Sequence, residues 1–162
     1  MIFIGIDPGK SGAVAVLDGD TERFGRSVFP TPTDGKEYNE AAMLALLEEY
    51  DMAKLCAIEK TQAMPGQGST SMHSIGYGAG LWHMALTACR IPFQVVSPRV
   101  WQKVMHAGIG GDDLKAKSII AAKRLFPLVS LKRTERSKID DHNMAEALLL
   151  AEYARRVYKE AT

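Results

Sequence analysis

The alternation of apolar and polar residues predicts that the chain opens with β-strands. Residues 2–7 (IFIGID) form a short apolar run that ends in an acid, and residues 12–18 (GAVAVLD) repeat this pattern after a Pro-Gly turn. Residues 23–29 (RFGRSVF) fit a third strand. The short turns between these runs predict an antiparallel meander, followed by a breaker-rich loop at 30–36.

The next part of the chain changes from a helical pattern to a strand pattern. Residues 39–50 place apolar side chains at helical spacing behind Asn39, a residue type that favours the N-cap. Residues 54–58 (KLCAI) form a short buried strand that Glu59 closes. Because a strand, a helix and a strand in series require a crossover, this strand is expected to pair parallel with the first one.

The second half of the chain contains mostly helical patterns. Its expected elements are a loop at 60–70, a helix rich in small residues at 71–90, a strand at 93–97, a short helix opened by Pro98, a Gly-rich loop at 107–113, a basic amphipathic helix at 114–125, an irregular stretch at 128–138 and a final helix from about 141 to 159. This order predicts an α/β fold with a mixed sheet flanked by helices, in one domain spanning residues 1–162.

Composition narrows the class of protein. The 162 residues are 46% apolar and 24% charged, as in ordinary globular proteins, and no apolar run approaches the length of about 20 residues that a membrane span needs. The first residues lack the basic start and cleavage site of a signal peptide, so we expect a cytoplasmic protein without a membrane partner. Cys56 and Cys89 lie in apolar contexts without metal-binding spacing, which predicts two buried thiols in a reducing compartment rather than a zinc site.

The net charge of +1 hides an uneven distribution of charge along the chain. Residues 90–138 contain eleven Lys or Arg and three Asp or Glu, whereas residues 1–89 contain six basic and eleven acidic residues. Residues 139–162 are also acidic, with three basic and five acidic residues. A basic middle beside acidic ends suits a polyanion held over carboxylates, although solvated helix faces also carry lysines.

Acidic residues occupy three apolar contexts that are far apart in the sequence. Asp7 and Glu59 each end an apolar strand, and Glu146 lies between alanines in the last helix. Neighbouring strand ends would bring Asp7 and Glu59 together, and a helix packed on the sheet could add Glu146 and Asp141. Each has a simpler interpretation, because Asp7 could form a turn, Glu59 could be a surface residue and Asp141 could cap the helix.

A cluster of carboxylates points to metal-dependent chemistry. Like charges a few ångströms apart raise one another's pKa, and a hard cation such as Mg²⁺ relieves that repulsion. Two such ions would activate water and stabilise the leaving oxygen during phosphodiester cleavage. The sequence therefore predicts a catalytic and metal-binding set of Asp7, Glu59, Asp141 and Glu146, with His142 as a further catalytic candidate.

Helix geometry restricts how the last helix could contribute. His142 and Asn143 precede Glu146 by four and three residues and therefore share its face. Asp141 precedes Glu146 by five residues, which places the two side chains about 140° apart within a helix. Asp141 could thus reach the site only from the N-cap or a frayed first turn, and His142 could be a ligand, a base, a DNA contact or merely a partly exposed polar residue.

Four segments resemble the RuvC-like Holliday junction resolvases, a family of the RNase H-like superfamily. They are IGIDPGKSGAVAVLD at 4–18, AIEK at 57–60, SPRVWQKVM at 97–105 and DHNMAEALLLAEYARR at 141–156. The last two are similar to phage and organelle members. Each segment alone is a weak signal, but together they follow the family's order over residues 1–156.

The resemblance implies an RNase H-like fold, a homodimer and paired nicks across a four-way DNA junction, without a small-molecule cofactor. It implies Mg²⁺, with Mn²⁺ able to substitute, and Asp7 and Glu59 as the first two ligands. In the last helix the family places two acids, or a His and an acid, three residues apart, and the matching pair here is Asn143 and Glu146. Asn143 is a poor substitute for a charged ligand, so Asp141 or His142 is expected to take its role.

The resemblance also assigns DNA contacts and a dimer interface. Lys103, Lys115 and Lys117 look like residues that contact the scissile phosphate or its neighbours, and Lys10 is a further DNA-binding candidate. The loop at 60–73, with Met64 and His73, is similar to the loop that reaches the junction centre. The helix at 75–89 (Tyr77, Leu81, Trp82 and Met84) is an interface candidate, with core packing as the alternative.

Other functions remain open at the level of sequence. A catalytically inactive DNA-binding accessory module would share the fold, but it has no need for three acids in apolar settings. A nuclease of the same fold acting on RNA or on RNA–DNA hybrids would carry the same acids. The resemblance suggests a phage or prophage source and a role in DNA recombination and repair or in debranching.

Overall fold

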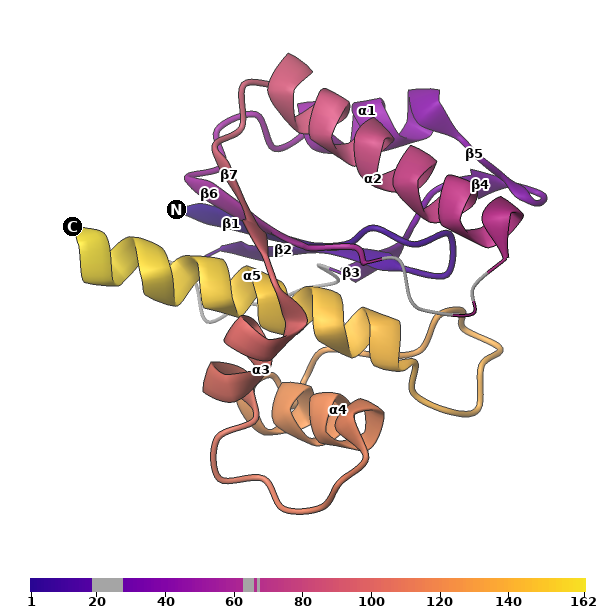
Figure 1. Cartoon of the computed structure of the whole chain (residues 1–162). Helices are drawn as coiled ribbons and strands as arrows, with labels where there is room; N and C mark the ends of the chain where they lie inside the picture. Colours follow the sequence, from indigo (N-terminus) through magenta and orange to yellow (C-terminus); the bar gives the residue numbers. More distant parts are fainter. Residues whose placement is uncertain (19–27, 63–65, 67) are drawn as a thin grey trace.

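A five-stranded β-sheet forms the centre of the molecule in the computed structural model, which describes residues 1–18, 28–62, 66 and 68–162 (Figure 1). Its strand order is β3-β2-β1-β6-β7, with bounds Val28–Pro30, Ala13–Asp18, Ile2–Asp7, Leu55–Glu59 and Phe93–Val96 respectively. Strands β1, β2 and β3 pair antiparallel, whereas β6 is parallel to β1 and β7 is parallel to β6. The predicted mixed sheet and the crossover to the first strand are therefore confirmed.

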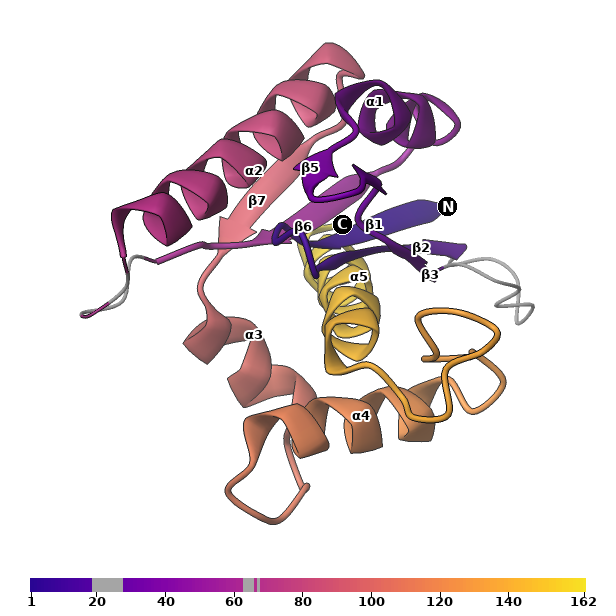
Figure 2. The same ribbon diagram turned by 90° about the vertical axis from the view of Figure 1, so that its right-hand side faces the viewer.

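Helices cover both faces of this sheet (Figures 1 and 2). Helices α1 (Glu40–Glu48) and α2 (Ser69–Ala88) lie on one face, and α5 (His142–Ala161) lies along the other. Helices α3 (Pro98–Met105) and α4 (Leu114–Leu125) form a further layer beside α5. As expected, Asn39 caps α1 through its side chain, which accepts a hydrogen bond from the amide of Ala42 at 3.0 Å.

The alternation of side chains along β1 divides the core into two clusters. Phe3 faces the cluster built with α3, α4 and α5, whereas Ile4 and Ile6 face the cluster built with α1 and α2. Because β1 is central, both of its faces are buried, which explains why its sequence is continuously apolar rather than alternating.

Gly5 lets α5 lie directly on β1. A Cβ atom at this position would come within 2.1 Å of the carbonyl oxygen of Ala147 and 2.2 Å of the amide nitrogen of Ala151. Only glycine permits the backbones of strand and helix to approach this closely. Since α5 runs antiparallel to β1 (Figure 1), this contact brings the start of α5 to the end of β1.

Two predictions about the region before α1 need adjustment. The predicted strand at 23–29 falls mostly on residues 19–27, which lie outside the described residues, and the strand that is described is Val28–Pro30. The predicted loop at 30–36 is wrong in part, because β4 (Thr33–Asp34) and β5 (Glu37–Tyr38) form a hairpin there. Gly35, at a φ of 60°, supplies the left-handed conformation that so short a turn requires.

Two further expectations concerned the burial of the two cysteines and the absence of a membrane-spanning segment. Cys56 is fully buried and free, as predicted, but Cys89 is free and only half-buried because it lies just beyond the exposed end of α2. Within the described ranges, we find no helix with the length and apolar character that crossing a bilayer requires.

Candidate active site

Asp7 and Glu59 lie side by side because they end neighbouring parallel strands. The register pairs Ile6 of β1 with Ile58 of β6, so the next residue along each strand is an acid. Both side chains are only partly buried, at the edge where the two strands leave the apolar core. The structure thus brings together the first two acids that the sequence predicted.

Glu146 reaches the same edge from α5. The residue that follows it, Ala147, lies against Gly5, two residues before Asp7. Glu146 is therefore carried toward the end of β1, and the charges of Glu59 and Asp7 both raise its pKa. This mutual influence places three acids from three distant segments within electrostatic reach of one another.

Withdrawal from water and mutual repulsion make the three carboxyls weak acids. Burial raises the pKa of Asp7 to about 6, and the charge of Asp141 adds to that effect. Burial and the charge of Asp7 raise the pKa of Glu59 to about 7. Burial and the charges of Glu59 and Asp7 raise the pKa of Glu146 to about 8. Near neutral pH the cluster therefore holds protons that a cation would displace.

Two hydrogen-bond donors from α3 and α4 contact these carboxylates. The indole Nε1 of Trp101 donates to Oε2 of Glu59 at 2.7 Å. The hydroxyl of Ser118 lies 3.2 Å from Oε1 of Glu146. Each bond lowers the pKa of the carboxyl it contacts, but burial outweighs it in both cases.

Asp141 occupies the N-cap of α5, where its side chain accepts from the amide of Asn143 at 2.8 Å. Its other oxygen accepts from Nη1 of Arg133 at 2.9 Å. Burial alone would raise the pKa of Asp141, but the bonds from Arg133 and from the amide of Asn143 lower it overall. Asp141 reaches the neighbourhood of Asp7 from the cap position, as the helix geometry required.

His142 is the first residue of α5 and is partly buried. Burial lowers the pKa of its ring, and so does the charge of Lys115, whereas Asp141 and Asp113 raise it. The charges that act on this ring come from Lys115, Asp141, Asp113 and Arg133, not from the three acids at the sheet edge. The structure therefore couples Asp141 to the acidic cluster more directly than His142.

The donor chemistry of the cluster suits a hard divalent cation, but the side chains do not form a finished cage. In the described part of the chain, no three His, Cys, Asp or Glu side chains are placed to hold one metal ion together. The expected tight convergence is thus not preformed. Glu59, Glu146 and Asp141 each accept a hydrogen bond, from Trp101, Ser118 and Arg133 respectively. Their carboxylate oxygens are the ligands that such a cation prefers.

The predicted lysines lie in different surroundings. The charge of Lys115 lowers the pKa of both Glu146 and His142, which couples this lysine to the acidic cluster. Lys103 and Lys117 line one shallow hollow of about 270 Å³ on α3 and α4. Lys10 turns instead to the β4–β5 hairpin, where Nζ donates to the carbonyl of Lys36 at 2.7 Å and lies 3.3 Å from Oε2 of Glu37.

The predicted loop residues meet different outcomes. Met64 lies outside the described residues. His73 is exposed in the first half of α2, and its ring stacks on that of Tyr77 with centroids 6.2 Å apart. Tyr77 also donates its hydroxyl to Oε1 of Glu40 at 2.8 Å. The prediction that the loop extends to residue 73 is therefore wrong, because α2 begins at Ser69 and carries the exposed ring pair of His73 and Tyr77.

The predicted interface helix divides into two sets of residues. Trp82 is fully buried in the core, so the core interpretation holds for this residue and the interface prediction is wrong for it. Tyr77 and Met84 are 47% and 65% exposed, which leaves them available for contacts outside the chain.

Sequence reasoning missed three residues that contact the acids: Trp101, Ser118 and Arg133. Trp101 belongs to a segment that resembles the resolvase family, but it is 42 positions from Glu59 and nothing in the sequence pairs the two. Arg133 belongs to an irregular basic stretch, yet its guanidinium also donates to the carbonyls of Ser11 at 2.7 Å and Gly12 at 3.1 Å. No local sequence pattern predicts contacts between segments that are so far apart in the chain.

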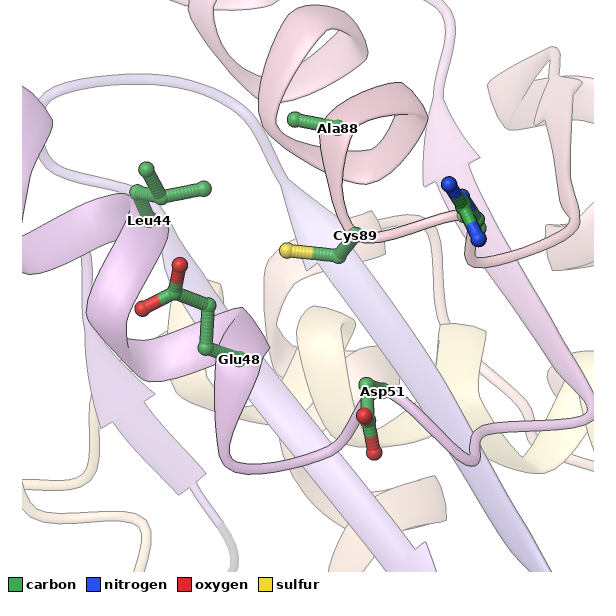
Figure 3. Close-up of a pocket in the computed structure, with 6 residues that line it drawn as sticks. Leu44, Glu48, Asp51, Ala88 and Cys89 are labelled. Carbon is green, nitrogen blue, oxygen red and sulfur yellow. The ribbon is translucent and has the colours of Figure 1, made fainter.

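A separate hollow of about 310 Å³ lies near the start of β6, whereas Glu59 ends that strand. It is lined by Leu44, Glu48, Asp51, Ala88, Cys89 and Arg90, and Figure 3 shows the sulfur of Cys89 pointing toward Leu44 and Glu48. Burial and the nearby charges of Glu48 and Asp51 raise the pKa of the Cys89 thiol, which keeps it protonated and a poor nucleophile. The acidic cluster is therefore the stronger candidate for catalysis.

Comparison with known proteins identifies the fold. No family model matches this sequence, and no curated protein sequence is significantly similar to it. Solved structures do match. One is Thermus thermophilus RuvC in complex with a Holliday junction substrate, at 16% identity and a TM-score of 0.70 over 100% of this chain and 97% of that chain.

Two further structures support the same assignment. Another Thermus thermophilus RuvC structure matches at 18% identity with a TM-score of 0.68, covering 100% of this chain and 98% of that chain. The yeast mitochondrial Holliday junction resolvase Ydc2 matches at 14% identity with a TM-score of 0.53, covering 98% of this chain and 83% of that chain. The chain therefore has the RNase H-like fold in the form found in RuvC, as the resemblance implied.

Proposed function

We propose that this protein is a divalent-metal-dependent endonuclease that cuts branched DNA, including four-way junctions. The observation that carries the proposal is the meeting of Asp7, Glu59 and Glu146, three carboxyls with raised pKa values, at one edge of a sheet with RuvC topology. A structural role would favour pairing each acid with a cation of the chain itself. The ion pairs formed within the described ranges involve other acids, among them Asp141 and Glu152.

Asp7, Glu59 and Glu146 would hold Mg²⁺, or Mn²⁺ in its place, with Asp141 as the fourth acid. Two such ions, when bound, would activate the attacking water and neutralise charge on the leaving oxygen. The task of the protein is to hold four carboxylates at fixed positions. Rigid elements do this here, because two acids end core strands and the others lie at the cap and the second turn of α5.

The basic middle of the chain would hold the DNA backbone over the acids. The charge of Lys115 acts on Glu146, and Lys103 and Lys117 would extend the positive surface across α3 and α4. Lysines on such a surface attract phosphates irrespective of base sequence.

The other proposed DNA contacts are Lys10, His73 and Met64, the last of which lies outside the described residues. The exposed ring of His73 could stack on a base, as aromatic side chains do on unpaired nucleotides. Lys10 would first have to leave its contacts with the β4–β5 hairpin.

Resolution of a junction requires two symmetric cuts, so the proposal includes a two-fold homodimer. The exposed Tyr77 and Met84 of α2 support an interface on that helix. Light scattering tests this element separately, because a strict monomer at working concentration would reject paired incision without rejecting nuclease activity.

The decisive experiment is cleavage of a labelled four-way junction with Mg²⁺, beside linear duplex, fork and RNA–DNA hybrid controls. Wild-type protein should cut the branched substrates, and Asp7→Asn, which preserves shape but removes charge, should not. Equal cutting by both proteins would remove Asp7 from the mechanism. Preferential cutting of the hybrid would favour the RNA-directed alternative, and junction binding without cutting by wild type would favour the inactive accessory module.

A further inference from the structure

We propose that Trp101 and Ser118 are positioning residues that orient the carboxylates of Glu59 and Glu146 for cation binding. The inference rests on the proposed function and deepens it, because it assigns a role to helices α3 and α4 beyond carrying basic residues. Both side chains are fully buried, and each gives a hydrogen bond to one acid of the cluster. The two helices thus hold two acids that come from different elements, β6 and α5.

Trp101 is bound to Glu59 by a short and directional contact. Its Nε1 can only donate, and it does so at 2.7 Å to Oε2 of Glu59 across 42 positions of sequence. A phenylalanine would fill much of the same apolar space without this donor. The indole at this buried position of α3 thus supplies a donor that phenylalanine lacks.

Trp82 supplies the contrast within the same molecule. It is also fully buried, but on the opposite face of the sheet, and its Nε1 has no hydrogen-bond partner among the described residues. Of these two buried tryptophans, one is tied to an acid of the cluster and the other is held by packing alone. Trp82 is therefore a matched control for the role of the indole N–H.

Ser118 provides the second donor through a small hydrogen-bond chain. Its Oγ lies 3.2 Å from Oε1 of Glu146, 3.1 Å from the carbonyl oxygen of Leu114 and 3.1 Å from Nε2 of His106. A hydroxyl has one hydrogen to give, but its oxygen can also accept. With Nε2 protonated, His106 donates to Ser118, whose single hydrogen is shared between the carbonyl oxygen of Leu114 and the carboxylate of Glu146. The ring of His106 is in turn packed edge-on against Trp101, with centroids 5.6 Å apart.

Removing either donor should weaken cation binding without dismantling the fold. A carboxylate that loses its outer partner can rotate away from the orientation that a cation needs. Loss of such outer partners typically weakens metal affinity about 10- to 100-fold. We therefore expect Trp101→Phe and Ser118→Ala each to raise the Kd for Mn²⁺ by that factor, and Trp82→Phe to leave it within about twofold of wild type.

The experiment measures Mn²⁺ binding by titration calorimetry and by tryptophan fluorescence, with circular dichroism to verify folding. In the Trp82→Phe protein, Trp101 is the sole tryptophan, and Mn²⁺ should change its emission. In the Trp101→Phe protein, Trp82 is the sole tryptophan, and its emission should not change. If Trp101→Phe fails to fold, Ser118→Ala and the fluorescence of the Trp82→Phe protein still decide the question.

The outcomes separate this inference from the proposed function. Wild-type Mn²⁺ affinity in folded Trp101→Phe and Ser118→Ala proteins would overturn the inference, even if all of them cut junctions. Weakened binding in these variants, with no cleavage by wild type, would reject the nuclease and leave the positioning role standing. Absence of Mn²⁺ binding to wild-type protein would overturn both.

Discussion

Two of the three glutamates of helix α5, Glu146 and Glu152, are withdrawn from water but differ in how their charge is compensated. Glu152 is 3% exposed and is bound by Arg155 at 2.6 and 2.7 Å and by Arg156 at 2.8 Å. Burial raises its pKa, but these bonds lower it overall. Glu146 has the Ser118 hydroxyl as its contact, lies near two other acids, and has its pKa raised to about 8.

The difference teaches how to distinguish a structural acid from a functional one. At Glu152 the chain supplies its own neutralising charge, so nothing external is needed. At Glu146 the Ser118 hydrogen bond and the charge of Lys115 lower the pKa, but burial and repulsion by Glu59 and Asp7 outweigh them, so the ionised form lowers stability unless a cation binds. Strained electrostatics of this kind are found where a protein binds a ligand or catalyses a reaction.

Replacing Glu146 or Glu152 by glutamine should have very different effects on DNA cleavage, and this is the largest difference that we expect between the two residues. Glu146→Gln should lose about 100-fold or more in cutting rate, the size of loss seen when one strongly acting catalytic group is removed. Glu152→Gln should cut at nearly the wild-type rate at temperatures where it is folded. Gel assays of a labelled junction under single-turnover conditions measure both.

A Glu152→Gln protein that is folded but inactive would contradict the comparison, because both glutamates would then be needed for cleavage. Cleavage at the wild-type rate by Glu146→Gln would also contradict it, because neither glutamate would then be shown to be needed. Circular dichroism at the assay temperature controls for loss of fold in either variant.

Stability should respond to the same two substitutions in the reverse order. Glu152→Gln removes the negative charge and one of the two acceptor oxygens that Arg155 and Arg156 contact, and should lower the free energy of unfolding by about 1 to 3 kcal/mol. The loss stays modest because these arginine side chains are 27% and 39% exposed and can hydrate. Glu146→Gln should be neutral or stabilising at pH 8 in the absence of divalent ions. Urea denaturation with a chelator present measures both, and equal destabilisation would contradict the distinction.

The pH dependence of stability sharpens the comparison further. The pKa values of Asp7, Glu59 and Glu146 are raised to about 6, 7 and 8, so the folded state holds protons that the unfolded state has already lost. Their contribution to stability is therefore greatest near pH 4 and is lost as the pH rises through 6 to 8. Each pKa unit by which folding raises the pKa of an acid contributes roughly 1.4 kcal/mol to this effect.

Glu152 should behave oppositely, since its lowered pKa gives stability that is lost on acidification. Urea midpoints from pH 4 to pH 9, with a chelator and then with Mg²⁺, measure both trends. Mg²⁺ should restore stability at high pH, and replacing Asp7, Glu59 and Glu146 by their amides should abolish the loss at high pH. A wild-type profile that stays flat above pH 5 would contradict the interpretation of the cluster.

The smallest expected effect concerns the fourth acid. Asp141→Asn keeps a good N-cap side chain but removes the charge beside Arg133, so stability should change by less than about 1 kcal/mol. Cutting should fall about tenfold, within the range for loss of one supporting metal contact. The cutting rate of His142→Gln should fall by a smaller factor, because the charges that act on the His142 ring do not come from the three central acids. A larger loss for His142→Gln than for Asp141→Asn would transfer the role to the histidine.

Much of the fold was predictable because its signals are local. The apolar runs of β1, β2 and β6 and the caps at Asn39 and Asp141 involve residues a few positions apart, and the structure places them as expected. The β4–β5 hairpin was missed because its strands, Thr33–Asp34 and Glu37–Tyr38, are too short to show a period.

The three central acids were predictable for a related reason. A charge at the end of an apolar strand, or among alanines in a helix, is conspicuous in the sequence itself. The positions of the lysines were not, because surface lysines occur everywhere, and Lys10 turns out to contact the β4–β5 hairpin.

The sequence by itself determined that Asp7, Glu59 and Glu146 would be withdrawn from water, because strand ends and helix faces follow from local apolar patterns. Only the tertiary structure decided what Glu59 and Glu146 would meet there. Glu152 found arginines one turn away on its own helix, whereas Glu59 and Glu146 met an indole and a hydroxyl from α3 and α4. The free energy of a buried charge depends on neighbours within a few ångströms, and those of Glu59 and Glu146 lie 42 and 28 positions away along the chain.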